Sequence, residues 1–127
     1  MSTKTEEIIL RNGNVIRNPY QGTDKRVLFV CTAGILRSAT AARIYAQKYN
    51  TRCAGSHIQY ALIPVTEDLL LWADEVVFMT NENYFETNQI LDMQTYIGKV
   101  RVLDIWDDYN HMDAGLIAQL HQQYEPL

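Results

Sequence analysis

One cysteine of the chain lies where it could act as a nucleophile. Cys31 directly follows the apolar run at 27–30, and Arg37 and Ser38 come six and seven residues later, where an alanine-rich stretch with helical spacing begins. A loop between a buried strand and a helix N-terminus can turn backbone N–H groups toward an anion. The same surroundings favour the thiolate form of a cysteine, which is the nucleophilic form. The spacing therefore predicts an anion site with a reactive sulfur beneath the anion.

The residue types between Cys31 and Ser38 suit a phosphate group. Gly34 can take a positive φ without penalty, which lets the backbone curl around an anion. The planar guanidinium of Arg37 can hold two phosphoryl oxygens, and the Ser38 hydroxyl can donate to the sulfur. A cysteine that ends an apolar strand is often only a small core residue, but the Arg-Ser pair at this spacing favours the anion site. The expected phosphate-binding residues are Thr32, Ala33, Gly34, Ile35, Leu36, Arg37 and Ser38.

A parallel sheet is needed to position this loop. Strand-like runs alternate along the chain with stretches of helical spacing, which predicts an α/β fold with a four-stranded parallel sheet between helices. Thr66 and Asp113 are the expected N-caps of two of the helices. Ligands of such sheets bind at the carboxyl ends of the strands, where the loop after the first strand lies. The predicted strands cover 27–30, 51–54, 75–79 and 99–103, and the predicted helices cover 38–49, 65–73, 81–93 and 114–124.

The first 25 residues form an extension to the domain predicted at 26–127. Two short β-prone runs within 7–17 flank Asn12 and Gly13, a dipeptide typical of a tight hairpin turn. The stretch 18–25 has turn-forming residues and no periodicity, and is interpreted as a linker.

Composition limits the class of protein. A chain of 127 residues with 47% apolar residues fits one globular domain, and no window is apolar enough for a membrane span. The net charge of −4 disfavours nonspecific binding to nucleic acid. The N-terminus does not resemble a secretory signal, so a cytoplasmic location and free thiols at Cys31 and Cys53 are expected.

No metal or cofactor is expected. His57, His111 and His121 are dispersed, and two cysteines do not give the spacing of a zinc site. The glycine-rich motifs of nucleotide and dinucleotide binding are absent. His111, beyond the aspartates near residue 107, is interpreted as an exposed loop residue.

With its segment VLFV-C-TAGIL-RS, the sequence resembles the low-molecular-weight protein tyrosine phosphatase family, in particular its compact branch. Further similar segments are Cys53–Ser56, Trp72–Asp74, Met79 and Asn83, and the resemblance covers 26–127. It implies a flavodoxin-like fold and hydrolysis of phosphate monoesters, with phosphotyrosine favoured, through a cysteinyl-phosphate intermediate and without a metal.

The resemblance also implies an aspartate general acid in the loop after the fourth strand. Asp107 matches the family's acid, while Asp108 stands where the family has proline. Asp104 and Asp108 are alternatives, and any of the three could be an ordinary solvated loop carboxylate. The implied catalytic residues are Cys31, Arg37 and Asp107.

Two departures from the family concern the phosphate loop. Gly34 replaces an asparagine whose side chain holds the loop in shape, so a less preorganised loop is expected. Leu36 replaces the second loop cysteine of many members, so their protective disulfide is absent, and Cys53 is interpreted as a buried strand residue. Aromatic candidates for the rim of the substrate pocket are Tyr20, Tyr60, Trp106 and Tyr109.

Three functions follow from these residues. The first is a cysteine-dependent phosphatase, whose partner is a phosphorylated protein or a small phosphate monoester. The second is a weak or inactive relative that binds phosphorylated partners, which the departures at Gly34 and Asp108 motivate. The third, arsenate reduction, needs cysteines that relay a disulfide, and only Cys53 is available. The sequence singles out no surface for oligomerisation.

Overall fold

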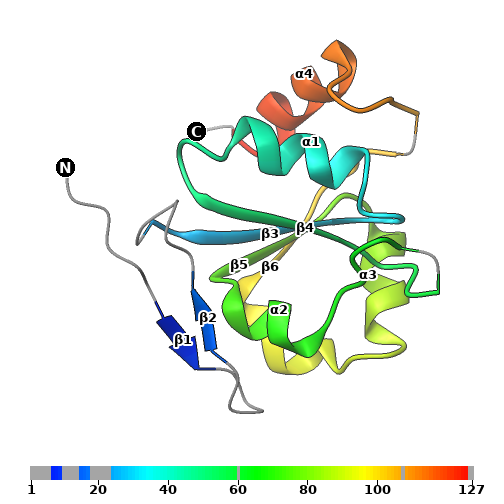
Figure 1. Ribbon diagram of the computed structural model, residues 1–127. Helices are drawn as coiled ribbons and strands as arrows, with labels where there is room; N and C mark the ends of the chain where they lie inside the picture. The colour runs from blue at the N-terminus through cyan, green and yellow to red at the C-terminus, as the bar shows by residue number, and fades with distance from the viewer. Residues whose placement is uncertain (1–6, 10–14, 18–23, 60, 107, 126–127) are drawn as a thin grey trace.

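A four-stranded parallel sheet forms the centre of the fold (Figure 1). The computed structural model describes residues 7–9, 15–17, 24–59, 61–106 and 108–125. The sheet has the order β4-β3-β5-β6, with parallel pairing throughout. Its strands are β3 (Arg26–Cys31), β4 (Asn50–Gly55), β5 (Glu75–Phe78) and β6 (Val100–Val102). The predicted α/β fold of flavodoxin-like type is confirmed.

Helices cover both faces of this sheet. Helices α1 (Arg37–Ile44) and α4 (Ala114–Gln123) lie on one face (Figure 1). The other face carries α2 (Glu67–Trp72), α3 (Asn81–Asn88) and the 3₁₀ helix η1 (Met93–Lys99). The fold is therefore a three-layer sandwich, as the alternating pattern predicted.

Strand β3 is buried on both faces, and its side chains divide between the two halves of the core. Phe29 and Cys31 join the cluster under α1 and α4, whereas Leu28 and Val30 join the cluster over α2. Burial on both sides explains why this strand is continuously apolar rather than alternating in sequence. Cys31 thus ends the central strand on the side of α1.

The two predicted N-caps are confirmed. The Thr66 hydroxyl accepts a hydrogen bond from the backbone N–H of Leu69 at 3.2 Å, and α2 begins at the next residue, Glu67. The Asp113 carboxylate accepts from the N–H of Gly115 at 2.7 Å, and α4 begins at Ala114. These side chains satisfy donors that would otherwise lack a partner within the helix.

Two helices end about five residues before their predicted ends, while α2 and α4 differ from the prediction only by one or two residues at a terminus. Helix α1 ends at Ile44 rather than Tyr49, because the following turn tightens and the N–H of Lys48 bonds the carbonyl of Tyr45 at 3.0 Å. Helix α3 ends at Asn88 rather than Met93. The Asn88 side chain accepts the N–H of Met93 at 3.1 Å, and the chain continues as η1.

The predicted hairpin strands near the N-terminus are present. Strands β1 (Glu7–Ile9) and β2 (Val15–Arg17) pair antiparallel, with Ile8 opposite Ile16. The predicted Asn12-Gly13 turn and most of the predicted linker lie outside the described residues. Among the residues that the structure describes, no helix is long and apolar enough to cross a membrane.

The strand order creates a crevice at one edge of the sheet. From β3 the chain moves to β4 on one side, and from β4 it crosses to β5 on the other side. Loops that leave the carboxyl ends of β3 and β5 therefore diverge, and ligands of open α/β sheets bind at this point. The segment that begins at Cys31 lies there.

Candidate active site

The sulfur of Cys31 accepts a hydrogen bond from the loop that follows it and contacts the Ser38 hydroxyl, and either atom of this second contact could be the donor. The backbone N–H of Gly34 lies 3.2 Å from Sγ, and the hydroxyl oxygen of Ser38 lies 3.1 Å from it. Cys31 is only 2% exposed, and Ser38 is fully buried in the first turn of α1. Donors aimed at a sulfur stabilise its negative charge, which is a requirement for a thiolate nucleophile.

Gly34 allows the loop to pack directly on the end of β4. It has a φ of +80°, and a Cβ atom added there would lie 2.8 Å from the carbonyl carbon of Ala54 and from the nitrogen of Gly55. A Cβ added at Gly55 would in turn lie 2.8 Å from the carbonyl carbon of Ala33. The loop and β4 thus touch backbone to backbone, and the space that an asparagine would need at Gly34 is filled.

The N-terminus of α1 is open toward the loop. Its N-cap residue, Leu36, makes no side-chain hydrogen bond to the first turn, and that turn holds no acidic residue. Uncapped N–H groups and the positive end of the helix dipole favour an anion at this position. This geometry agrees with the anion site predicted from the sequence.

Arg37 is buried at the first position of α1, where it bonds one backbone carbonyl and one loop side chain. Its Nη1 donates to the carbonyl of Ile105 at 2.8 Å, and its Nη2 donates to the Thr32 hydroxyl at 3.1 Å. The residue is 2% exposed. A charge buried to this extent is costly unless it has hydrogen-bond partners or a ligand. The bonds to Ile105 and Thr32 supply such partners and hold the guanidinium at the edge of the loop.

Asn83 holds the loop from the opposite side, and its part in the site was not deduced from the residue pattern. Its Nδ2 donates to the hydroxyl of Thr32 at 3.2 Å and to that of Ser56 at 3.1 Å. Its Oδ1 accepts the N–H of Thr80 at 3.2 Å, which completes the capping box of α3. The Ser56 hydroxyl then donates to Glu86 at 2.7 Å.

The loop is also held at Thr32, its second residue. The Thr32 hydroxyl accepts hydrogen bonds from both Arg37 and Asn83. The pattern Thr80-x-x-Asn83 resembles a capping box and could have indicated the helix start. Only the fold brings Asn83 to Thr32, which lies 51 residues earlier in the chain.

The segment between β6 and α4 carries the three candidate acids. Asp107, the favoured acid, lies outside the described residues. The Asp104 carboxylate accepts the indole N–H of Trp106 at 2.6 Å, and Asp108 is exposed. Asp104 is thus engaged with a neighbouring side chain.

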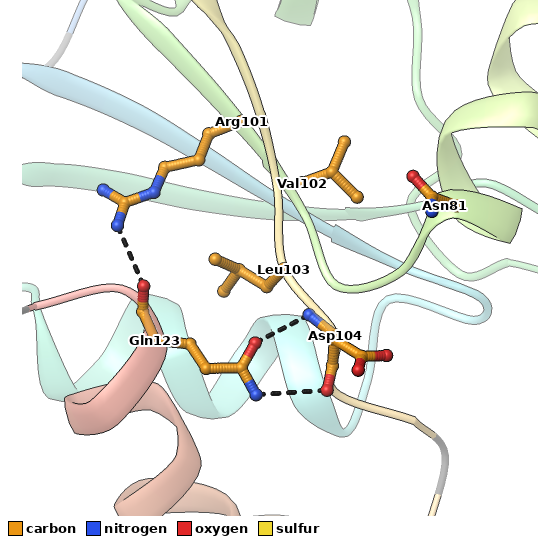
Figure 2. A pocket seen from close by; sticks show the side chains of 6 residues that line it. All are labelled: Asn81, Arg101, Val102, Leu103, Asp104 and Gln123. Atoms are coloured by element: carbon orange, nitrogen blue, oxygen red, sulfur yellow. Dashed lines mark hydrogen bonds between the residues drawn. The ribbon is translucent and has the colours of Figure 1, made fainter.

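Gln123 of α4 fixes the start of this segment (Figure 2). Its side-chain oxygen accepts the N–H of Asp104 at 2.7 Å, and its side-chain nitrogen donates to the Asp104 carbonyl at 3.1 Å. The backbone carbonyl of Gln123 also accepts from Nη2 of Arg101 at 2.9 Å. The carboxamide therefore pairs with the backbone of Asp104 as a neighbouring strand would. An open hollow of about 680 Å³ lies beside this pair.

The predicted rim aromatics differ in exposure. Trp106 is 46% exposed, whereas Tyr109 is half-buried and packs against the cluster under α1 and α4. Tyr20 and Tyr60 lie outside the described residues. Ile35, within the loop itself, is 44% exposed. It was predicted only as a phosphate-binding residue, but it also adds an apolar side chain to the rim.

The second cysteine is not part of the loop. Cys53 lies half-buried on β4, opposite Phe29 in the sheet, and both cysteines are free thiols, as expected. Burial raises the pKa of the Cys53 thiol, and the charge of Cys31 raises it further. Such a thiol stays protonated at neutral pH. Cys53 lies on a strand as predicted, but it is half-buried rather than buried.

The histidines are separated in the structure as well. The backbone N–H of His57 bonds the carbonyl of Thr32 at 3.0 Å. His121 pairs with Glu125, beyond the end of α4, through a 2.8 Å contact. His111 is exposed, as interpreted from the sequence, with its ring near Thr40.

Two solved structures share this fold. The tyrosine phosphatase Wzb from Escherichia coli K30, solved in complex with phosphate, aligns with a TM-score of 0.60 and 18% identity over 79% of this chain and 93% of Wzb. A YwlE mutant from Bacillus subtilis aligns with a TM-score of 0.51 and 21% identity over 80% of this chain and 99% of YwlE. No family model and no curated protein matches the sequence. The chain therefore has the fold of the low-molecular-weight tyrosine phosphatases, as the residues around Cys31 predicted.

Proposed function

We propose that the protein hydrolyses phosphate monoesters through a cysteinyl-phosphate intermediate on Cys31, with protein phosphotyrosine as the favoured substrate. One observation carries the proposal: the Cys31 sulfur lies beside the N-terminus of α1, where it accepts a hydrogen bond from the Gly34 N–H and contacts the Ser38 hydroxyl. The fold shared with Wzb, which was solved with phosphate, supports it.

The first step forms a bond between sulfur and phosphorus. The Cys31 thiolate attacks the phosphorus, the bond to the leaving oxygen breaks, and Asp107 gives that oxygen its proton. Backbone N–H groups of the loop and the Arg37 guanidinium hold the three remaining phosphoryl oxygens, where charge accumulates in the transition state. The Ser38 hydroxyl stabilises the sulfur.

The second step regenerates the enzyme. A water molecule attacks the phosphorus of the intermediate, and the Asp107 carboxylate takes its proton as general base. The bond between sulfur and phosphorus breaks, the thiolate returns, and inorganic phosphate leaves. No metal or cofactor enters either step.

The test is hydrolysis of para-nitrophenyl phosphate under reducing conditions between pH 4 and 8. Wild type should turn over, Cys31→Ser should not, and Asp107→Asn should lose about 10²- to 10⁴-fold in rate, the usual contribution of a general acid. Cys53→Ser is the matched control, because it removes the other thiol outside the loop and should retain activity. A well-folded wild type that binds phosphate without turnover would indicate a phosphate-binding module instead.

A further inference from the structure

The segment that carries Asp107 is bonded to α1 at both ends. Near its start, the carbonyl of Ile105 accepts from Arg37 at 2.8 Å, and Ile105 is almost fully buried. Near its end, the backbone N–H of Met112 donates to the Thr40 hydroxyl at 2.8 Å. Arg37 and Thr40 are three residues apart on one helix, which places them on the same helical face.

Thr40 makes two contacts with the end of the segment. Its side chain is fully buried, and its hydroxyl oxygen also lies 3.3 Å from Nδ1 of His111. A hydroxyl can accept one hydrogen bond and donate another. It can therefore accept from Met112 and donate to the His111 ring at the same time.

The backbone at Met112 depends on this anchor. Met112 has a φ of 59°, the left-handed region that residues other than glycine rarely adopt. A conformation of this kind persists where surrounding contacts hold it. The bond to Thr40 is such a contact, and it turns the chain into Asp113, the N-cap of α4.

We propose that Thr40 is a positioning residue that anchors the segment between β6 and α4, to which the proposed acid Asp107 belongs in sequence. The inference rests on the proposed function. Helix α1 presents its N-terminus to the phosphate and its Thr40 hydroxyl to the far end of the Asp107 segment. The segment that carries the proposed acid and the phosphate site are thus both attached to one helix. Small displacements of catalytic groups lower the rate strongly.

The experiment compares two substrates whose leaving groups differ in their need for a proton. Nitrophenolate leaves readily without protonation, whereas phenolate from phenyl phosphate needs the acid. We expect Thr40→Val to lower kcat/KM for phenyl phosphate by about tenfold or more, and for para-nitrophenyl phosphate by less than about threefold. Thr40→Ser, which keeps the hydroxyl, should return the ratio of the two values toward that of wild type.

Controls separate a positioning role from a structural one. Thr51→Val removes a hydroxyl that bonds the Ala42 carbonyl at 2.7 Å, at the far end of β4 from the loop, and should leave the ratio unchanged. An equal loss for both substrates in Thr40→Val, or no rescue by Thr40→Ser, would overturn the inference. If Thr40→Val does not fold, because a methyl group takes the place of the buried hydroxyl, Thr40→Ala also removes the hydroxyl and gives the same comparison.

Two further results complete the test. In wild type, the Met112 amide should be protected from hydrogen exchange, and exchange at the unprotected rate would overturn the inference without any variant. A folded wild type with no turnover of either ester would instead contradict the proposed function, and the positioning role would fail with it. Turnover that persists in Cys31→Ser would contradict the nucleophile alone.

Discussion

The guanidinium of Arg37 donates to the carbonyl oxygen of Ile105 at 2.8 Å, so the arginine of the loop is bonded to the segment that carries Asp107. A second nitrogen of the same group donates to Thr32 within the loop. The planar, branched shape of arginine allows one side chain to serve both partners and still face an anion. The loop after β3 and the segment between β6 and α4 are therefore connected through a single buried side chain.

Arg37→Lys should weaken phosphate binding although it keeps the positive charge. A lysine ammonium cannot form the paired, planar contact with two phosphoryl oxygens and also reach Ile105 and Thr32. We expect the inhibition constant for inorganic phosphate to rise by about tenfold or more, in line with the loss of one charge-assisted hydrogen bond. Arg43→Lys, at an exposed position of the same helix, is the matched control. Equal phosphate inhibition in Arg37→Lys and wild type would contradict this role.

Gly34→Ala should destabilise the protein and weaken anion binding. The φ of +80° and the 2.8 Å approach to Ala54 and Gly55 leave no room for a Cβ atom. Strained backbone alone costs about 1–3 kcal/mol, and the loop must also move away from β4. Urea unfolding and phosphate inhibition measure the two effects. Gly98→Ala, where an added Cβ meets nothing within 4 Å, should leave both unchanged.

Gly34→Asn gives a sharper version of this test. The family that the sequence resembles has asparagine at this position, and asparagine tolerates a positive φ better than alanine does. The clash with β4 remains, however, because it arises from the Cβ atom that both residues share. We expect Gly34→Asn to lose activity. A gain in activity would show that β4 can retreat to make room for the Cβ atom.

Asn83 contacts both the loop and the start of α3, and a substitution that keeps one contact and removes the other should separate their effects. Asn83→Asp keeps an oxygen that can accept from Thr80, but it loses the amide donor to Thr32 and Ser56. It also places a negative charge near the anion site. We expect phosphate affinity to fall by about tenfold or more, as for a lost charge-assisted contact, with a smaller change in the melting temperature than in Asn83→Ala. A variant with normal phosphate affinity would show that Thr32 does not need Asn83.

Much of the fold could be predicted because the central elements follow local patterns. The apolar run at 27–30 is buried on both faces, and Thr66 and Asp113 cap the helices that follow them. The end of α1 could not be predicted in this way. Tyr45 and Tyr49 pack in the same aromatic cluster, so their spacing continues the helical pattern after the helix has ended. At the end of α3 the Asn88 side chain accepts the N–H of the first residue of η1, a contact that the helical pattern of the sequence does not reveal.

The site was predictable where it is local and not where it depends on distant contacts. Cys31, Arg37 and Ser38 lie within one strand-loop-helix unit, so their spacing alone placed the sulfur beside the helix N-terminus. Asn83 and Gln123 act on residues 51 and 19 positions away, and only the sheet order brings them there. The acid itself, Asp107, stays a prediction.

Alkaline pH should destabilise the folded protein through two buried tyrosines. Burial raises the pKa of Tyr124 above its ordinary value, and its hydrogen bond to Glu75 at 2.7 Å raises it further. Burial and the charge of Glu125 do the same for the pKa of Tyr45. Because both groups are neutral when protonated, the folded state resists their ionisation while the unfolded chain ionises near about pH 10. Their contribution to stability is therefore complete below about pH 10 and is lost as the pH rises above it.

The measurement is the urea midpoint between about pH 8 and 12, with absorbance of tyrosinate followed in parallel. The double variant Tyr45→Phe/Tyr124→Phe should show a shallower fall above about pH 10 than wild type, because neither phenylalanine can ionise when the chain unfolds. At about pH 8, below the tyrosine range, the same variant should be less stable than wild type, since Glu75 loses the hydroxyl that bonds it. An identical slope in both proteins at alkaline pH would show that these two tyrosines ionise in the folded state as easily as in the unfolded chain.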